Sequence, residues 1–152
     1  MGGYGALRVG LGYPEHYVSI NSHSGALGWG RGGERIGIQE VAERRGWTAA
    51  FTEEMARIFG DCPVGTEHDV LELARRAHTR GVLPQLLLDC GKDDYLIEDS
   101  RNFHAALLAD RIPHDYREFA GAHTWDYWDE HVREALAFHA RLLAADPRPA
   151  GR

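Results

Sequence analysis

The sequence predicts an α/β fold in which a mostly parallel sheet is flanked by helices. Segments with the two-residue periodicity of strands alternate along the 152 residues with segments of helical periodicity. Leu83 to Leu88 is an almost unbroken apolar run, which is typical of a strand buried on both faces. Alternation of this kind favours parallel strands with helices on both faces of the sheet.

The first elements expected are a helix, a strand and a loop. Residues Gly2 to Leu11 have helical character despite their glycines, and Val18 to Ser22 alternate apolar and polar side chains like a short strand. Six glycines between Gly25 and Gly37 predict a loop. Thr48 or Thr52 is suited to cap a following helix, which Gly60 would end.

The second part of the chain is expected to add three helices and two strands. The strands are Leu83 to Leu88 and Ile112 to Phe119. Apolar residues at helical spacing mark the helices: Val70, Leu71, Ala74 and Ala77 before Gly81; Phe103, Leu107 and Leu108; and Trp125, Trp128, Val132, Leu136, His139 and Leu143. The last of these stripes is expected to face the core, with Trp125 and Trp128 as its anchors.

Composition limits the kinds of partner. A net charge of −6 argues against nucleic acid and anionic membrane surfaces. No apolar run approaches the ~18 residues of a membrane span. Cys62 and Cys90 form no disulfide framework and are expected to be free and partly buried. The compartment is undecided: Met1-Gly2-Gly3-Tyr4 has no signal-peptide character, which favours the cytoplasm over secretion.

Two segments carry residues suited to catalysis. One segment, Asp89 to Asp94, follows the Leu-rich strand, and the other, Ala120 to His123, follows the next strand. Ligand sites of parallel sheets lie at these strand ends. An acid followed by a histidine also fits the later two members of a Ser, Asp, His triad. Asp93 and Asp94 have an alternative interpretation as solvated turn residues.

Metal, nucleotide and other cofactor sites are not expected. The histidines form no HExxH motif, and the cysteines are not paired at metal-ligand spacing. The glycines between Gly25 and Gly37 do not follow a strand with a phosphate-binding pattern. The residues alone therefore give no reason to expect a metal ion or a bound nucleotide.

Five motifs occur in the order found in one esterase family of the α/β-hydrolases. They are Met1-Gly2-Gly3-Tyr4-Gly5-Ala6-Leu7, Ser22-His23-Ser24-Gly25-Ala26-Leu27, Ile58-Phe59-Gly60-Asp61, Leu88-Asp89-Cys90-Gly91-Lys92-Asp93-Asp94, and Gly121-Ala122-His123-Thr124-Trp125-Asp126-Tyr127-Trp128. The first resembles the residues that follow the serine in Gly-x-Ser-Met-Gly-Gly-Tyr-Gly-Ala-Leu. The family includes esterase D, S-formylglutathione hydrolases, and acetyl and feruloyl esterases.

The resemblance implies a serine esterase that acts on a small-molecule carboxylic ester or thioester. Asp94 takes the position of the triad acid, His123 that of the base, and Met1 that of an oxyanion-hole donor. Trp125 is a candidate for substrate binding. The family's serine would stand directly before Met1, so residues 1–145 are expected to be the C-terminal portion of an α/β-hydrolase domain, truncated after the nucleophile, with a disordered tail at 146–152.

Two further expectations follow from the resemblance. A sheet without the family's preceding strands would leave an edge exposed, and the chain is expected to self-associate through that edge. The alternative function is a non-catalytic, truncated or degenerate hydrolase-like chain that binds a small molecule or a partner.

Overall fold

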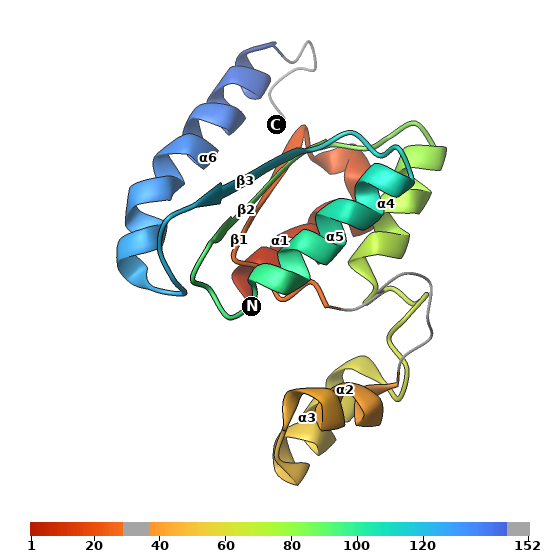
Figure 1. Ribbon diagram of the computed structural model, residues 1–152. Helices are drawn as coiled ribbons and strands as arrows, with labels where there is room; N and C mark the ends of the chain where they lie inside the picture. Colours follow the sequence, from red (N-terminus) through yellow and green to blue (C-terminus); the bar gives the residue numbers. More distant parts are fainter. Residues whose placement is uncertain (29–36, 146–152) are drawn as a thin grey trace.

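Three parallel strands form a single sheet in the order β1-β2-β3 (Figure 1). The computed structural model describes residues 1–28 and 37–145. The strands are β1 (Ser19–His23), β2 (Gln85–Gly91) and β3 (Asp115–Phe119). Both pairings are parallel, so the strands end together at one edge of the sheet, where His23 lies opposite Asp89 and Gly91 opposite Phe119.

The helices are α1 (Gly2–Gly12), α2 (Ile38–Arg45), α3 (Ala49–Phe59), α4 (Val70–Thr79), α5 (Ile97–Ala109) and α6 (Trp125–Ala145), with a short 3-10 turn, η1 (Pro14–His16). Helices α1, α4, α5 and α6 cover the two faces of the sheet, whereas α2 and α3 pack against each other away from it (Figure 1). On β1, Ile20 meets Gly10 of α1 whereas its neighbour Ser19 contacts His139 of α6. Because successive side chains of a strand point to opposite faces, α1 and α6 lie on opposite sides of the sheet. The predicted α/β fold is confirmed.

The main core lies between the sheet and helices α1, α4 and α5. Its most deeply buried members come from every one of these elements: Leu7, Leu11, Ile20, Val70, Leu71, Ala74, Leu86, Leu88, Phe103 and Leu107. Leu87 points to the other face and packs with Ala135 and Phe138 of α6. A central strand that is apolar on both faces explains why the Leu-rich run of β2 shows no alternation.

Helix ends follow the predicted capping chemistry where a polar cap is present. The Thr48 side chain accepts a hydrogen bond from the Phe51 N–H at the start of α3, and Gly60 ends that helix with a φ of 76°. Asp69 caps α4 by accepting from the Leu71 and Glu72 N–H groups. Helix α2 was not predicted, because among its residues only Ile38 and Ala42 are buried and its other side chains leave no clear apolar stripe.

The predicted core face of α6 is wrong. Trp125 is 82% exposed, Leu136 62% and Leu143 61%, while the buried residues are Tyr127, His131, Ala135 and Phe138. The buried stripe of α6 is therefore shifted by one position along the sequence from the predicted stripe. The physical reason is that the sheet face covered by α6 is polar near the strand ends. Asp89 on that face accepts a hydrogen bond from the Tyr127 hydroxyl, so a tyrosine rather than a tryptophan is buried there.

Smaller differences concern the neighbouring elements. Leu108 is 59% exposed, so only Phe103 and Leu107 of that predicted stripe are buried. Strand β3 begins at Asp115 rather than at Ile112, whose side chain is buried ahead of the strand. The predicted glycine loop lies partly, and the predicted tail at 146–152 wholly, outside the described residues.

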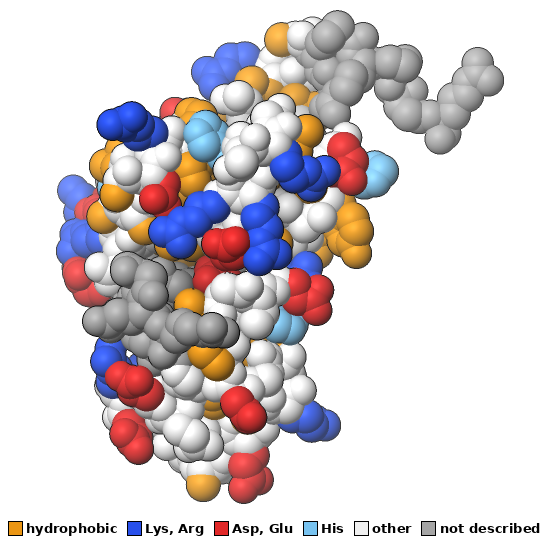
Figure 2. Space-filling view, turned by 90° about the vertical axis from the view of Figure 1, so that its right-hand side faces the viewer, with side chains coloured by type: hydrophobic (Ala, Val, Ile, Leu, Met, Phe, Trp, Pro, Cys, Tyr) orange, Lys and Arg blue, Asp and Glu red, His pale blue; other side chains and the backbone are white. Residues whose placement is uncertain are grey.

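Surface and cysteine properties agree with the composition. Acidic and basic side chains are interspersed over the face drawn in Figure 2. Cys62 is half-buried and Cys90 buried, and neither forms a disulfide bond within the described residues. No helix in the described part of the chain is both long and apolar enough to cross a membrane.

We expect the 152-residue chain, studied alone, to self-associate. β1 ends the sheet on one side, and a cavity of about 410 Å³ lies along it between α1 and His139. The outer stripe of α6 adds exposed Val132, Leu136 and Leu143. Open strand edges and apolar stripes both promote association. Light scattering after gel filtration should give a mass above one chain, and a monodisperse monomer at micromolar concentrations would contradict the expectation.

Candidate active site

The acid loop follows the end of β2 and turns Asp94 inward. The Asp94 N–H donates to the Gly91 carbonyl at 3.1 Å, which closes a tight turn directly after the strand. Asp94 is 2% exposed, whereas its neighbour Asp93 is exposed. The interpretation of Asp94 as a solvated turn residue is therefore wrong, and for Asp93 that interpretation is correct.

The histidine loop follows β3 and packs directly against the acid loop. The Asp93 N–H donates to the Gly121 carbonyl at 2.9 Å, and the Lys92 N–H donates to the Phe119 carbonyl at 2.8 Å. Gly91 is needed for this approach because a Cβ there would lie 2.7 Å from the Gly121 carbonyl carbon and closer still to its oxygen. Gly121 has a φ of 125°, which side chains rarely tolerate. The two loops are thus fixed in register by backbone contacts.

Asp94 and His123 form a hydrogen-bonded pair. The His123 Nδ1 lies 2.9 Å from the Asp94 Oδ2, and the other carboxylate oxygen accepts from the Leu96 N–H at 2.9 Å. A carboxylate only accepts, so the His123 proton is on Nδ1 and Nε2 is free to take a proton from a substrate or nucleophile. The structure thus pairs His123 with Asp94, the acid that the resemblance selects, rather than with Asp93.

Aromatic rings hold the His123 imidazole on two sides. Its ring centroid lies 4.8 Å from that of Tyr95 and 4.8 Å from that of Trp128, which is nearly perpendicular. The Trp128 Nε1–H donates to the Ser24 hydroxyl at 3.3 Å. The His123 side chain remains 23% exposed, so the ring is positioned by its neighbours but still accessible.

A cavity of about 400 Å³ opens at this pair. Its wall is formed by the start of α1 (Met1, Gly2, Gly3), by the end of β1 (Asn21, His23, Ser24), and by His123, Trp125 and Trp128. Three residues predicted from sequence, Met1, His123 and Trp125, thus meet in one cavity, with Asp94 buried behind His123. Met1 is the N-cap of α1, so the positive end of that helix points toward this cavity region.

Buried polar groups lie behind the pair. Cys90 is fully buried beside Asp94, and burial followed by the Asp94 charge raises the pKa of its thiol to about 11. This thiol is therefore protonated at neutral pH and is not suited to act as a nucleophile. Ser22 and Ser24 are buried as well, at 1% and 2% exposure, and neither lies in a Gly-x-Ser-x-Gly segment.

Sequence reasoning missed a second histidine–carboxylate pair. The His23 Nδ1 lies 2.5 Å from an Asp89 oxygen, and Asp89 also accepts hydrogen bonds from Tyr127 and Asn21. The pKa of the Tyr127 hydroxyl is raised well above its ordinary value, mainly because the group is buried and secondly because the Asp89 charge is close. The available signal was register: parallel pairing of the two strands sets His23 beside Asp89.

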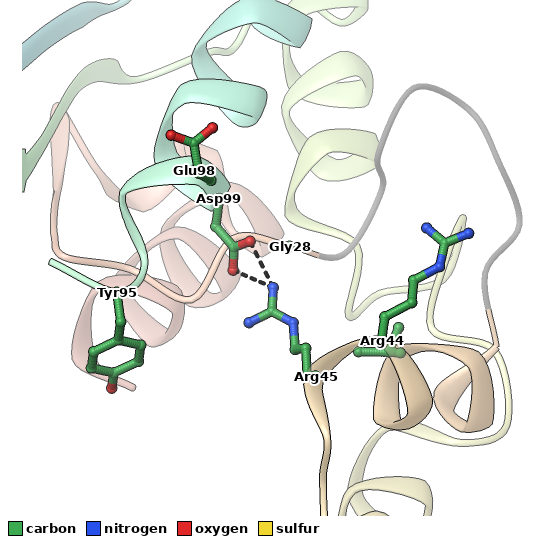
Figure 3. A pocket seen from close by; sticks show the side chains of 7 residues that line it. Gly28, Arg44, Arg45, Tyr95, Glu98 and Asp99 are labelled. Carbon is green, nitrogen blue, oxygen red and sulfur yellow. Dashed lines mark hydrogen bonds and ion pairs between the residues drawn. The ribbon is translucent and has the colours of Figure 1, made fainter.

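A separate cavity of about 240 Å³ lies between α2 and α5 (Figure 3). One Arg45 nitrogen donates to both Asp99 oxygens at 2.6 Å, and a Cβ at Gly28 would lie 2.9 Å from the Asp99 carboxylate. Glu98, also at this cavity, binds Arg101. The Arg45–Asp99 ion pair joins α2 to α5, whereas the Glu98–Arg101 pair lies within α5. Tyr95, whose ring packs against that of His123, also lines this cavity.

Metal chemistry has no obvious site in the described residues. Within ranges 1–28 and 37–145, no three His, Cys, Asp or Glu side chains are grouped to hold a metal ion. The chemistry that the arrangement does support is proton transfer by His123, oriented by Asp94.

Comparison with known proteins agrees with this geometry. The family described as "Putative esterase" matches residues 1–139. An acetyl esterase of Caldicellulosiruptor saccharolyticus is 30% identical over 149 residues, which are 93% of this chain and 52% of that protein. The chain therefore spans about half the length of this relative.

Solved structures show the same relation. An S-formylglutathione hydrolase from Staphylococcus aureus superposes with a TM-score of 0.70 at 26% identity, over 91% of this chain and 51% of that one. A ferulic acid esterase superposes with a TM-score of 0.65 at 20% identity, over 93% of this chain and 48% of that one, which supports the fold alone. From the family match, which covers most of its length, the chain belongs to the "Putative esterase" family of α/β-hydrolases.

Proposed function

We propose that this chain provides the acid and base of a serine esterase that hydrolyses small-molecule carboxylic esters or thioesters. The observation that carries the proposal is the Asp94–His123 hydrogen bond of 2.9 Å, at the wall of a cavity that Met1 also lines. An imidazole and a helix N-terminus at one cavity, with a buried carboxylate behind the imidazole, are the parts that acyl transfer requires besides the nucleophile.

His123 is the general base and then the general acid. Its Nε2 takes the proton of a serine hydroxyl as the oxygen attacks the ester carbonyl, and it returns that proton to the departing alcohol or thiol. Water then repeats the sequence on the acyl-serine, which releases the carboxylic acid. Asp94 keeps the proton on Nδ1 and stabilises the imidazolium that forms.

The nucleophile in this proposal is a serine that directly precedes Met1 in a longer chain. The resemblance of Met1-Gly2-Gly3-Tyr4 to the residues after the family's serine supports this placement, as does the position of Met1 in the cavity beside His123. As a peptide N–H in such a chain, the Met1 amide is placed to donate to the oxyanion, assisted by the N-terminus of α1.

Trp125 is proposed as a substrate-binding residue. It is 82% exposed and lines the cavity, and its ring packs at 5.3 Å against that of Trp128. An indole in this position offers apolar surface to the acyl or alcohol portion of an ester. Two relatives are named for their substrates, an acetyl esterase and an S-formylglutathione hydrolase. Both names agree with a substrate that has a small acyl group, and together they allow either an oxygen or a sulfur leaving atom.

The location of the nucleophile can be tested by fluorophosphonate labelling. The 152-residue chain alone is expected to hydrolyse p-nitrophenyl acetate no faster than background and to take up no stoichiometric label, because it contains no Gly-x-Ser-x-Gly segment. The same chain, extended by the residues that its gene encodes in frame before Met1, should be labelled on the serine that adjoins Met1.

Two results would contradict the proposal. Stoichiometric labelling of Ser22, Ser24 or another serine of the 152 residues would place the nucleophile elsewhere. An in-frame stop codon directly before the Met1 codon would favour the alternative of a non-catalytic, hydrolase-like chain. Mass spectrometry of labelled peptides and sequencing of the gene distinguish these results.

A further inference from the structure

Ser24, which directly follows β1, has a backbone conformation that serine rarely adopts. Its φ is 45°, in the left-handed region that favours glycine, and among the described residues Arg111 is the one other non-glycine residue with a positive φ. Such a conformation costs free energy, and residues that hold it cluster at functional sites. A serine at a position suited to glycine indicates that its hydroxyl group has a use.

Backbone and side-chain contacts hold Ser24 in this conformation. Its N–H donates to the Asp89 carbonyl at 2.9 Å, directly past the end of β1, and the residue is 2% exposed. Burial and then the Asp94 charge raise the pKa of the neighbouring Cys90 thiol, while the Ser100 and Ser24 hydroxyls lower it. The Ser24 hydroxyl is therefore oriented to donate toward the Cys90 sulfur, which leaves its oxygen lone pairs available as acceptors on the other side.

The hydroxyl oxygen of Ser24 accepts a hydrogen bond from an indole. The Trp128 Nε1 lies 3.3 Å from the Ser24 Oγ. Trp128 belongs to the first turn of α6, so this contact joins the end of β1 to the start of the last helix. An indole has a single N–H donor, and a fixed partner for that donor also fixes the rotation of the ring.

The indole that Ser24 orients forms one wall of the His123 site. The Trp128 and His123 ring centroids lie 4.8 Å apart with an interplanar angle of 89°, which is an edge-to-face contact. The hydrogen bond to Asp94 fixes one corner of the imidazole but leaves the ring free to tilt. The aromatic contacts therefore set the direction of Nε2. Tyr95, on another side of the imidazole, is 76% exposed, so Trp128 is the firmer support.

We propose that Ser24 is a positioning residue that holds the Trp128 indole against His123, so that the imidazole stays paired with Asp94 and its Nε2 points into the cavity. This inference rests on the proposed function, in which His123 is the base. Ser24 takes no part in proton transfer and acts through Trp128. The left-handed backbone conformation is the device that turns the Ser24 hydroxyl toward α6.

Two variants separate positioning from a purely structural role. Ser24→Gly removes the hydroxyl and also relieves the backbone, because glycine adopts a φ of 45° freely. Its Tm should equal or exceed that of the wild type. Trp128→Phe keeps an aromatic ring but removes the N–H donor. If Ser24 served only to form the turn after β1, glycine would replace it without loss at the active site.

The first measurement is ¹⁵N-edited histidine side-chain NMR of the 152-residue chain, which reports solvent exchange of the His123 Nδ1 proton. Ser24→Gly should accelerate this exchange about tenfold, as expected when one neutral hydrogen bond no longer restrains the site. Trp128→Phe should have the same effect. The double variant should add nothing further, because both substitutions remove one interaction.

The second measurement is esterase kinetics on the longer chain that carries the serine proposed to precede Met1. Ser24→Gly should lower kcat and kcat/KM together by about tenfold. KM should stay unchanged, because the reacting group is misplaced while the cavity remains. A raised KM at unchanged kcat would make Ser24 a binding residue and overturn the inference.

Ser22→Ala is the matched control. It removes another buried hydroxyl, on β1, that has no hydrogen-bond partner in the described structure, and it should leave both measurements within about twofold of the wild type. Unchanged proton exchange in Ser24→Gly, an equal effect of Ser22→Ala, or additive effects in the double variant would each contradict the inference. The NMR measurement needs no nucleophile, so an inactive longer chain would refute the proposed function and leave the role of Ser24 decided by proton exchange.

Discussion

Replacing Asp94 by asparagine is expected to lower kcat/KM of the serine-bearing hydrolase about 10⁴-fold. The asparagine is nearly isosteric, so it can still accept from the Leu96 N–H as Asp94 does. Its amide group, however, no longer holds the His123 proton on Nδ1 and has no charge to stabilise an imidazolium. The measurement is the steady-state hydrolysis of p-nitrophenyl acetate by the longer chain that carries the serine proposed to precede Met1.

The neighbouring aspartate provides the matched control for this loss. Asp93 is exposed on the same turn, and only its backbone N–H contacts the histidine loop. Asp93→Asn removes the same charge one residue away and should leave kcat/KM within about twofold, as is usual for surface substitutions. If both variants lose activity equally, the effect is electrostatic and general, and the assignment of Asp94 as the triad acid is wrong.

The chemistry of the strand ends was predictable because it depends on chain order and on strand direction. An acid after β2 and a histidine after β3 had to meet once the two strands were parallel neighbours. The glycines at Gly91 and Gly121 marked places where the chain turns sharply. The choice of Asp94 rather than Asp93, and of His123 among the histidines, came from the resemblance to the motifs of the esterase family.

The orientation of α6 was not predictable in this way, because it depends on the face that the helix meets. Its tryptophans and leucines formed the more regular apolar stripe, yet Tyr127 and His131 are buried. The His23–Asp89 pair creates a polar patch on the sheet that favours a tyrosine hydroxyl over an indole. That pair depends on strand register, which periodicity does not define.

The largest effect on stability is expected from Gly91→Ala. A Cβ at this position would overlap the Gly121 carbonyl oxygen and lie 3.2 Å from the Ala122 nitrogen. Both neighbours are backbone atoms in hydrogen-bonded loops, so neither loop can move aside without a large cost in free energy. We expect the free energy of unfolding to fall by about 3 kcal/mol, which corresponds to a Tm lower by about 10 °C.

Gly5→Ala is the control that makes this prediction specific. Gly5 is in the interior of α1, and a Cβ there would meet nothing within 4 Å. Alanine at that position should raise the free energy of unfolding by about 0.5–1 kcal/mol, because it reduces the backbone freedom of the unfolded chain. Urea unfolding followed by circular dichroism, at a protein concentration low enough to limit self-association, measures both variants.

Gly91→Ala should also displace the histidine loop, since the added Cβ would overlap the backbone of Gly121. A variant that keeps the wild-type stability and an unchanged His123 environment would show that the two loops are not in the close contact that brings Asp94 to His123.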